Sequence, residues 1–496
     1  MGREFAARLP GLSSGTPIRP SHPALSPGRL PGWTENGPRD RRPRRPARPN
    51  TLLPSAWGPL LSAWRSDAAL QRQLRLASVA AFASIASMRA CDPMLLTLAG
   101  EFHSSLGEAA LVVSAFAIAY GLLQLFYGPL GERIGKLRVI AFACAGCAFA
   151  SAIAALAPTL DTLVWARALM GATAAGIVPM TIAWIGDHVP YEERQETLAR
   201  LLGSTVSGMI AGLWLGAWIT ETFGWRAVFV VLALTFAAAA VPLHRGTRAR
   251  PASAVPGPAP AAIAPLAQNT SNASSAPATP EPTTVAPAAK PTAPAWQSLL
   301  DLLRLPRDRR VRWVLAMVAI EGALMFGVLA FVPSHLARQH GLGTAAAGSV
   351  LALYGVGGLL YSRGAKRLLR ALGERGLAIL GGTLIGAALL LLTWGGHWLG
   401  ALPACLCAGA GFYMLHTTLQ TQATQMAPAQ RGNAVALFAC VLFLGQSAGV
   451  AAVSVAIDRG SVAWVFSACA LALMLLGVAV SRGVGRSPEQ VSDPMR

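Results

Sequence analysis

The sequence predicts an all-α membrane protein that crosses the bilayer twelve times, as two pseudo-symmetric bundles of six helices. The 496-residue chain is 53% hydrophobic and only 13% charged, whereas about a quarter of the residues of a soluble domain are charged. Twelve apolar runs are long enough to span a bilayer. Residues of the first six runs also recur at one constant offset in the second six, which indicates an internal duplication.

The apolar runs form two groups of six, separated by a polar segment. In the first group they cover residues 76–98, 108–129, 138–157, 163–186, 199–219 and 226–243. In the second group they cover residues 312–335, 345–362, 376–396, 398–420, 432–455 and 462–481. We therefore expect an N-terminal bundle over residues 76–243 and a C-terminal bundle over residues 311–482.

Three segments outside the bundles differ in composition. Residues 1–75 are rich in Arg and Pro and have no apolar core of the kind found in a secretory signal. We expect a disordered tail there, or residues that precede the true start codon. Residues 244–310 are rich in Pro and Ala and predict a flexible linker. Residues 483–496 predict a second tail.

The basic residues alternate between the two sides of the predicted membrane. The formal charge is +19, but the bases are spread over the tail and alternate loops, which argues against nucleic-acid binding. The loops after even-numbered spans contain Arg133, Lys136, Arg138, Arg194, Arg200, Arg245, Arg248, Arg363, Lys366, Arg367, Arg370, Arg375 and Arg431. The opposite loops contain only Arg226, Arg338 and Arg459. By the positive-inside rule, both termini and the linker are expected in the cytoplasm.

The cysteines do not indicate a redox or metal site. All seven fall within apolar runs, and Cys144 and Cys147 have C-x-x-C spacing without a second ligand pair nearby. Buried small side chains explain them. We find no nucleotide motif, nucleophile elbow or metal cluster, so we expect no enzyme activity, no cofactor and no metal.

The duplication is visible at an offset of 234 residues. Tyr120-Gly121 and Tyr127 precede Glu132-Arg133 in the first half. Tyr354-Gly355 and Tyr361 precede Lys366-Arg367 in the second half. The second copy has no acid at the position equivalent to Glu132, so only the first can form a complete charge network.

The most specific motif is the segment between spans 2 and 3, which we call the elbow (residues 128–138). It reads as a glycine-rich tight turn with one acid and three bases. The pattern G-x-L-x-(D/E)-R-x-G-(R/K)-x-(R/K) is filled by Gly128, Leu130, Glu132, Arg133, Gly135, Lys136 and Arg138. It resembles the signature loop of the major facilitator superfamily of secondary transporters, with Glu132 where that family usually has Asp.

The resemblance implies that the elbow latches the outward-facing state of a two-bundle transporter. Glu132 would pair with a base or a helix end across the bundle interface, and Arg133 would pair within its own half. A few charge-assisted contacts of this kind can bias a two-state equilibrium. The alternative is that these bases only set the topology.

Spans 4 and 5 contain two further family-like features. Arg167 lies inside span 4, where an arginine is costly and therefore a functional candidate. It resembles the arginine that the family ties to proton coupling, although it could instead snorkel to the outer surface. Gly208, Gly212 and Gly216 give span 5 a bare face for close helix packing. They resemble the family's antiporter motif, with Leu213 in place of its proline.

The charged residues of spans 1 and 7 are the candidates for proton coupling. Arg89 and Asp92 lie three residues apart on one face of span 1 and precede Pro93, which would loosen the helix. They resemble the first-span acid of twelve-span drug:proton antiporters; the alternative is a neutralised structural pair. Glu321 lies near the middle of span 7 with no base beside it in the sequence, and it is the strongest single candidate for a protonatable or cation-binding site. A structural hydrogen bond is its alternative.

Tyr413 and His416 are polar groups on span 10, which lines the cavity in this family. They are candidates for contact with substrate or, alternatively, structural side chains.

We expect a proton-coupled efflux permease of the bacterial inner membrane, acting by alternating access as a monomer, with protons, a small organic solute and the lipid bilayer as partners. Uptake of a small, possibly anionic, metabolite is the first alternative. A non-transporting membrane receptor, or a transferase on the same scaffold, is the second.

Overall fold

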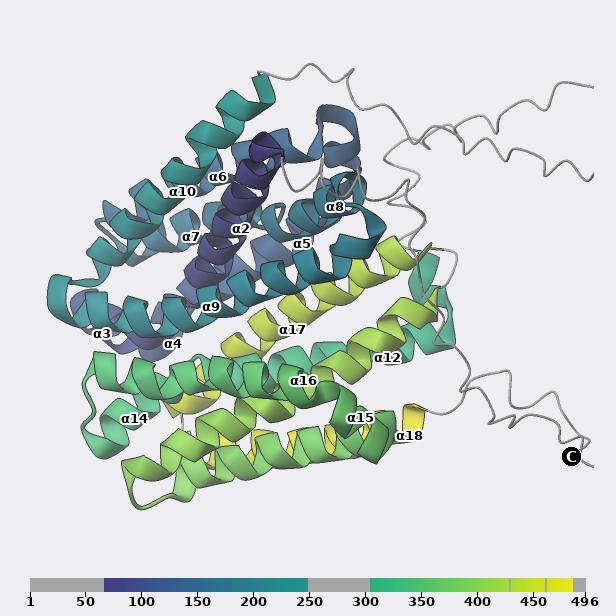
Figure 1. Cartoon of the computed structure of the whole chain (residues 1–496). Helices are drawn as coiled ribbons and strands as arrows, with labels where there is room; N and C mark the ends of the chain where they lie inside the picture. Colours follow the sequence, from purple (N-terminus) through teal and green to yellow (C-terminus); the bar gives the residue numbers. More distant parts are fainter. Residues whose placement is uncertain (1–66, 249–303, 428–429, 460–461, 485–496) are drawn as a thin grey trace, which may run out of the picture. The chain divides into compact units, whose positions relative to one another are not determined.

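The polypeptide folds into helices throughout the part of the chain that the structure describes. The computed structural model describes residues 67–248, 304–427, 430–459 and 462–484 (Figure 1). Eleven helical stretches in these residues are long and apolar enough to cross a membrane. Lipid offers no hydrogen-bond partners, so each crossing satisfies its backbone within a helix.

The first half contains six crossings. The helices are α2 (Ala68–Arg89), α3 (Leu95–Glu101), α4 (Leu106–Ala109), α5 (Leu111–Ile134), α6 (Lys136–Ala155), α7 (Leu160–Ala174), α8 (Ile177–His188), α9 (Tyr191–Phe223) and α10 (Trp225–Arg248). Crossing 1 combines α2 and α3 across the 3₁₀ turn η1 (Asp92–Met94). Pro93 in this turn cannot donate a backbone hydrogen bond, and the helix breaks there as expected. Crossing 4 combines α7 and α8.

The second half is built in the same way. Its elements are η2 (Leu305–Arg307), α12 (Arg309–Glu321), η3 (Gly322–Phe326), α13 (Gly327–Leu329), α14 (Val332–His340), α15 (Thr344–Trp394), η4 (Trp398–Gly400), α16 (Ala401–Met426), α17 (Arg431–Arg459) and α18 (Val462–Gly483). Crossing 7 runs from α12 through the π-helical turn η3 to α14, and it therefore changes helical pitch in mid-membrane.

The 51 residues of α15 make two crossings. Gly373 has φ 64° and ψ 176°, a conformation that breaks the helix and suits glycine. Gly357 and Gly381 lie beside Leu406 and Gly411 of the same helix α16. A straight helix would separate residues 24 apart by about 36 Å, so the chain must reverse between them. Ten stretches cross once and α15 crosses twice, which gives twelve crossings in the described residues.

The structure moves several predicted boundaries. The tail predicted over residues 1–75 is wrong for its last part, because α2 begins at Ala68. The linker predicted over residues 244–310 is shorter, because α10 continues to Arg248 and α12 starts at Arg309. The rest of both segments, and most of the predicted C-terminal tail, lies outside the described residues.

The elbow is also less of a turn than predicted. Helix α5 continues through Pro129 to Ile134, and only Gly135, with φ 93°, leaves the helical conformation before α6 begins. We call the end of the molecule that contains Gly135 and Gly373 the elbow end. The other end, where α9 gives way to α10 and α14 to α15, is called the opposite end.

Among the described residues, two helix pairs form most of the contact between the two halves. Within the first half, α2 packs on α9 and α6 on α10. Within the second half, α15 packs on α16 and α18. Between the halves, α5 packs on α17 and α9 packs on α15. These two contacts involve crossings 2 with 11 and 5 with 8, as expected when two copies of one unit face each other.

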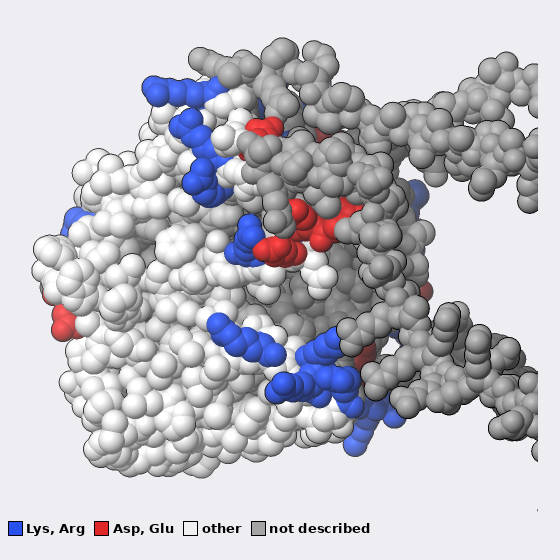
Figure 2. Space-filling model, in the orientation of Figure 1, with Lys and Arg blue, Asp and Glu red and all other residues white. Residues whose placement is uncertain are grey.

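The surface separates charge from apolar area. Figure 2 shows the larger groups of Lys and Arg toward the elbow end, beside a broad uncharged surface. At the opposite end, exposed tryptophans lie among a smaller number of charged residues: Trp165, Trp218, Trp394, Trp398 and Trp464. The two described tryptophans in the elbow-end part of the bundles, Trp184 and Trp313, are buried or half-buried. Tryptophan favours the lipid headgroup level, so this ring marks one membrane interface.

Candidate functional site

Glu321 and His416 form a buried pair inside the second half. Glu321 is the last residue of α12 and has no exposed surface. His416 of α16 brings its Nδ1 to 2.9 Å from Oε2 of Glu321. The other carboxylate oxygen, Oε1, is buried and has no partner among the described residues. The base that the sequence lacked next to Glu321 therefore comes from a helix 95 residues further along the chain.

Close helix packing holds this pair in place. Glycines of crossing 7 and α17 face each other's backbone: a Cβ on Gly322 would lie 2.3 Å from the carbonyl oxygen of Leu442, and one on Gly445 would lie 2.3 Å from that of Ala319. The imidazole of His416 is stacked on the ring of Phe412, with centroids 5.0 Å apart. The backbone contact with α17 holds the segment that carries Glu321, and stacking on Phe412 holds the imidazole of His416.

Arg89 and Asp92 form a second buried pair, in the first half. The guanidinium Nη1 lies 3.3 Å from Oδ2 of Asp92. Asp92 has no exposed surface, and its Oδ1 has no described partner. The guanidinium also lies 4.3 Å from the centre of the Phe326 ring, which belongs to the second half. This cation–π contact connects the pair to crossing 7.

Tyr354 lies beside Phe412, with ring centroids 5.8 Å apart, and was not predicted as a site residue. Its hydroxyl is buried and has no described hydrogen-bond partner. The sequence marked Tyr354 only as a repeat of Tyr120. Its contact with Phe412 depends on the packing of α15 on α16.

Arg167 is fully buried and does not snorkel. Its Nε donates to the carbonyl oxygen of Val112 at 3.2 Å, and its Nη1 donates to that of Ser87 at 2.9 Å. The guanidinium lies 4.3 Å from the centre of the Phe116 ring. Arg167 of α7 therefore ties together crossings 1 and 2, and its Nη2 has no described partner.

Tyr413 packs rather than joining the buried pair. Its ring meets that of Phe412 edge-on at 5.5 Å, and a Cβ on Gly358 would lie 2.3 Å from it. Of the two candidates on crossing 10, His416 thus contacts Glu321 directly and Tyr413 lies beside it.

The elbow has a different charge network from the one expected. Glu132 pairs with Lys136, one helical turn away, at 3.1 Å, instead of reaching across the interface. Lys136 also donates to Asp187 of α8 at 2.5 Å. Arg133 is exposed and has no ion pair among the described residues, although a partner in its own half was expected. The helix continues past Glu132, and this places Lys136 within reach. Nothing in the sequence pattern indicated Asp187, which lies 51 residues from Lys136.

The glycines of α9 face α2. A Cβ on Gly208 would lie 2.3 Å from the carbonyl oxygen of Phe82, and one on Gly212 would lie 2.4 Å from that of Ala86. At Gly216 the nearest atom is the carbonyl oxygen of Ala90, at 3.3 Å. The two backbones therefore approach most closely at the first two glycines.

The described bonds between the halves lie at the opposite end and in the middle of the molecule. Glu221 at the end of α9 accepts a hydrogen bond from the backbone N–H of Ala345 in α15. Ser447 of α17 donates to the carbonyl oxygen of Ser114 in α5 at 3.0 Å. Nearer the middle, the rings of Tyr120 and Phe443 are 4.7 Å apart. The halves are thus held together toward the opposite end.

The cysteines and acids show no metal site. All seven cysteines are free, and Cys147 lies 3.2 Å from the hydroxyl of Thr173. Among the described residues, no group of three or more His, Cys, Asp or Glu side chains could hold a metal ion.

Comparison with known proteins identifies the fold and the family. The model of the family described as "Major Facilitator Superfamily" matches residues 77–450. Among solved structures, the nucleoside transporter NupG superposes with a TM-score of 0.63 at 13% identity, over 83% of this chain and 99% of that one. A bacterial homologue of the human lysosomal transporter Spinster gives a TM-score of 0.59 at 15% identity, over 84% and 95%.

Curated relatives match over a shorter region. The multidrug efflux pump LfrA of Mycolicibacterium smegmatis is 32% identical over 169 residues, which cover 33% of this chain and 32% of LfrA. The multidrug export protein EmrB of Escherichia coli is 23% identical over 154 residues, 31% of this chain and 30% of EmrB. A uridine/deoxyuridine transporter of Lactococcus lactis is 30% identical over 183 residues, 36% and 37%. The chain thus aligns with about a third of the length of these relatives.

Proposed function

The chain belongs to the Major Facilitator Superfamily of membrane transporters, and from this premise we propose that it exports a small organic solute in exchange for protons by alternating access. The observation that carries the proposal is the buried Glu321–His416 pair. We further propose that it acts as a monomer in a bacterial inner membrane. The basic elbow end would face the cytoplasm, with both termini on that side.

The Glu321–His416 pair has the chemistry of a proton site. A lone carboxylate at membrane depth costs several kcal/mol, so Glu321 requires either a proton or a cationic partner. His416 can supply that partner, since an imidazole changes charge near neutral pH. The unpartnered Oε1 of Glu321 leaves one position open for a proton or a solute donor.

The first-half pair would couple this site to the movement of the halves. Arg89 is balanced by Asp92 on its own crossing and by the Phe326 ring on the other half. Phe326 and Glu321 lie on the same crossing, so a change of charge at Glu321 can act on the contact of that crossing with Arg89. Coupling requires that proton binding favour one arrangement of the halves over the other, and Arg89 is the cation that lies on their boundary.

The conformation fits one state of an alternating cycle. The described bonds between the halves lie toward the opposite end, and in the proposed orientation this is the inward-facing state. The elbow charges are then satisfied within their own half by Lys136 and Asp187. In the outward-facing state, the elbow would become available to latch the second half.

The arginines favour a neutral or cationic solute over an anion. Arg167 donates to two backbone carbonyls and lies against the Phe116 ring, which leaves Nη2 as its nitrogen without a described partner. Arg89 is already paired with Asp92. Most of the hydrogen-bonding capacity of the two arginines is therefore used within the protein, so we rank anion uptake below efflux.

The test is proton flux in everted membrane vesicles. Tetraphenylphosphonium, chloramphenicol, lactose, benzoate and uridine would be added in turn to vesicles with an acidified lumen. We expect at least one cation or neutral solute to release lumenal protons. Glu321→Gln should abolish this release while the protein remains in the membrane, and Glu196→Gln, a change of an exposed acid, should not affect it.

Two results would count against the proposal. Full proton release with Glu321→Gln would remove the pair from the coupling mechanism. No response to any solute, with the unaltered protein present in the vesicles, would contradict efflux. A signal restricted to benzoate or uridine, with protons and solute moving in the same direction, would favour uptake.

A further inference from the structure

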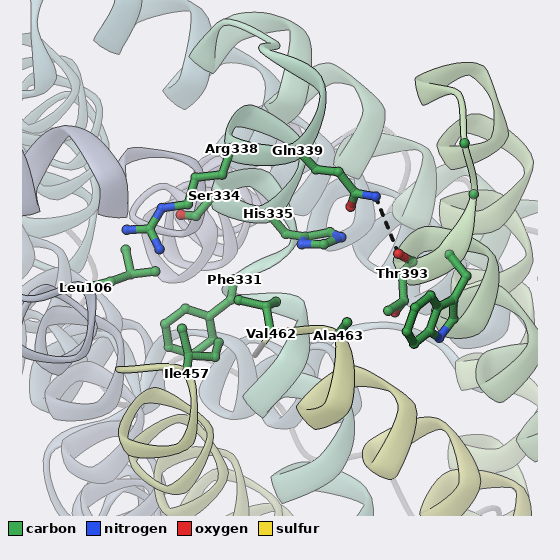
Figure 3. Close-up of a pocket in the computed structure, with 13 residues that line it drawn as sticks. Leu106, Phe331, Ser334, His335, Arg338, Gln339, Thr393, Ile457, Val462 and Ala463 are labelled. Atoms are coloured by element: carbon green, nitrogen blue, oxygen red, sulfur yellow. Dashed lines mark hydrogen bonds between the residues drawn. The ribbon is translucent and has the colours of Figure 1, made fainter. Parts of the chain in front are cut away.

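A cavity at the opposite end lies apart from the buried pairs. It has a volume of about 480 Å³ and is an open pocket lined by residues of α14 and of the adjacent ends of α15, α17 and α18 (Figure 3). Small-molecule sites usually enclose about 300–1,000 Å³. None of Glu321, His416, Arg89 or Asp92 lines it. The cavity is therefore a second place where a small molecule could bind.

The wall of the cavity carries a cation and no acid. Arg338 of α14 lines it, and no Asp or Glu does. Arg338 has no ion pair among the described residues, and its guanidinium extends beside Ser334 toward Leu106 in Figure 3. The carboxylate of Asp458 lies against Gly107, next to Leu106, but it is not part of the lining. The lining therefore favours an anion.

Ser334 supplies a second donor on the same helix face. It lies one turn before Arg338, is 2% exposed, and its hydroxyl has no described hydrogen-bond partner. A buried hydroxyl without a partner is destabilising, and an acceptor inside the cavity would remove that cost. The hydroxyl and the guanidinium together match one carboxylate or phosphate group.

The other polar residues of the wall are already bonded to backbone. His335 Nε2 lies 3.2 Å from the carbonyl oxygen of Leu392, and Gln339 donates to that of Thr393 at 3.4 Å (Figure 3). These bonds fix α14 against the end of α15. They leave Ser334 and Arg338 as the donors for a ligand, so the site suits a single anionic group and not a polyanion.

The remaining wall is apolar and lies at an interface. Phe331, Ile457, Val462 and Leu106 line the cavity beside the two donors. Trp394 also lines it, and Trp394 and Trp464 are exposed at this level, where aromatic residues meet lipid headgroups. We propose that this cavity binds an amphiphilic anion, with the anionic group on Arg338 and Ser334 and an apolar body against Phe331 and Ile457.

One wall of the cavity belongs to the other half of the protein. Leu106 begins α4 in the first half, whereas the other lining residues belong to the second half. Separation of the halves at this end would remove Leu106 from the cavity. A bound amphiphile would therefore stabilise the state in which the opposite end is closed.

The test is calorimetric titration of octanoate into the full chain in phosphatidylcholine nanodiscs. We expect saturable binding, with Arg338→Gln about tenfold weaker and Ser334→Ala weaker by a smaller factor. Arg367→Gln, which removes an exposed arginine at the elbow end, should bind like the unaltered chain. Octan-1-ol, which lacks the charge, should bind all variants equally. Arg338 is exposed, so Arg338→Gln should fold; a melting temperature checks this.

Equal octanoate affinity in the unaltered chain and in Arg338→Gln would overturn the proposal. So would octan-1-ol binding as tightly as octanoate. Repeating the titration with phosphatidylglycerol in the nanodisc distinguishes the two sources of the anion. Loss of the Arg338-dependent binding there identifies a lipid phosphate as the occupant, and unchanged binding identifies a free organic anion. Because no step of the test measures transport, its result is independent of the proposed efflux.

Discussion

Glu221 caps a helix of the other half of the protein. Its carboxylate accepts a hydrogen bond from the backbone N–H of Ala345 at 2.5 Å. Ala345 lies in the first turn of α15, whose own N-cap residue, Gly343, has no side chain to satisfy the free N–H groups. A Cβ on Gly343 would lie 3.0 Å from the Glu221 carboxylate. The backbone N–H of Ala345 in the first turn of crossing 8 therefore has this hydrogen bond only while the opposite end is closed.

Replacement of Glu221 should loosen this closure. A charge at a helix N-terminus contributes about 0.3–1 kcal/mol, so Glu221→Gln should reduce the ratio of closed to open opposite ends by about two- to fivefold. Distances between spin labels at Thr222→Cys and Ala346→Cys would report the shift. Glu108→Gln is the matched control, because Glu108 caps α4 within its own half. An equal shift in both variants would contradict the role of Glu221.

The elbow should act in the opposite direction. If Glu132 latches the outward-facing state, Glu132→Ala should increase the inward-facing population. In the present conformation the substitution removes the pair with Lys136, but Lys136 still pairs with Asp187. Cysteine accessibility from the two membrane sides would measure this. Glu196→Ala serves as control because it also breaks an exposed pair one turn apart, with Arg200. Unchanged accessibility in Glu132→Ala would indicate that the elbow bases only set topology.

The glycine face of α9 predicts a stability difference within one helix. At Gly212 a Cβ would lie 2.4 Å from the carbonyl oxygen of Ala86, whereas at Gly203 nothing lies within 4 Å. Gly212→Ala should lower the melting temperature by several degrees because α2 and α9 must separate. Gly203→Ala should leave it unchanged or raise it slightly, since alanine favours helix by up to about 1 kcal/mol. Equal melting temperatures for Gly212→Ala and Gly203→Ala would show that α2 can move away from α9 without loss of stability.

Arg167 should not tolerate lysine. Its guanidinium donates in two directions, to Val112 and Ser87, while covering Phe116. A lysine is a flexible point charge that cannot reproduce this fork, so Arg167→Lys should lower stability by about 2–4 kcal/mol and reduce transport. Thermal unfolding in detergent, alongside a transport assay, would test this. A stable but inactive Arg167→Lys would instead indicate a direct role in coupling.

The fold was predictable because lipid restricts the backbone to a few solutions. Crossings could be counted from apolar length, and Pro93 marked the break in crossing 1. The matching break in crossing 7 was missed. Ala90 and Ala330 end their helical segments with the same φ of −61° and ψ of −28°, each three residues before a proline. These residues are 240 apart, so the offset of 234 read from crossings 2 and 8 did not align them.

The site was only partly predictable, because some of its contacts join residues close together in the sequence and others join residues far apart. Arg89 and Asp92 are three residues apart, and helical spacing alone brings them together. Glu321 was recognised from its cost in lipid, but its contact with His416 depends on how α12 packs on α16. Glu132 is paired with Lys136 in this structure because α5 continues past it. Its partner across the interface belongs to the outward-facing state and stays a prediction.

The tryptophan ring at the opposite end has a consequence for the surrounding bilayer. Trp165, Trp394 and Trp464 are all more than 60% exposed there, and such residues hold a protein at a fixed depth in one leaflet. A change in membrane thickness would then be absorbed in the other leaflet, around the elbow end, where the halves must separate and close. Acyl-chain length should therefore alter the rate of the transport cycle, even for a solute that never touches lipid.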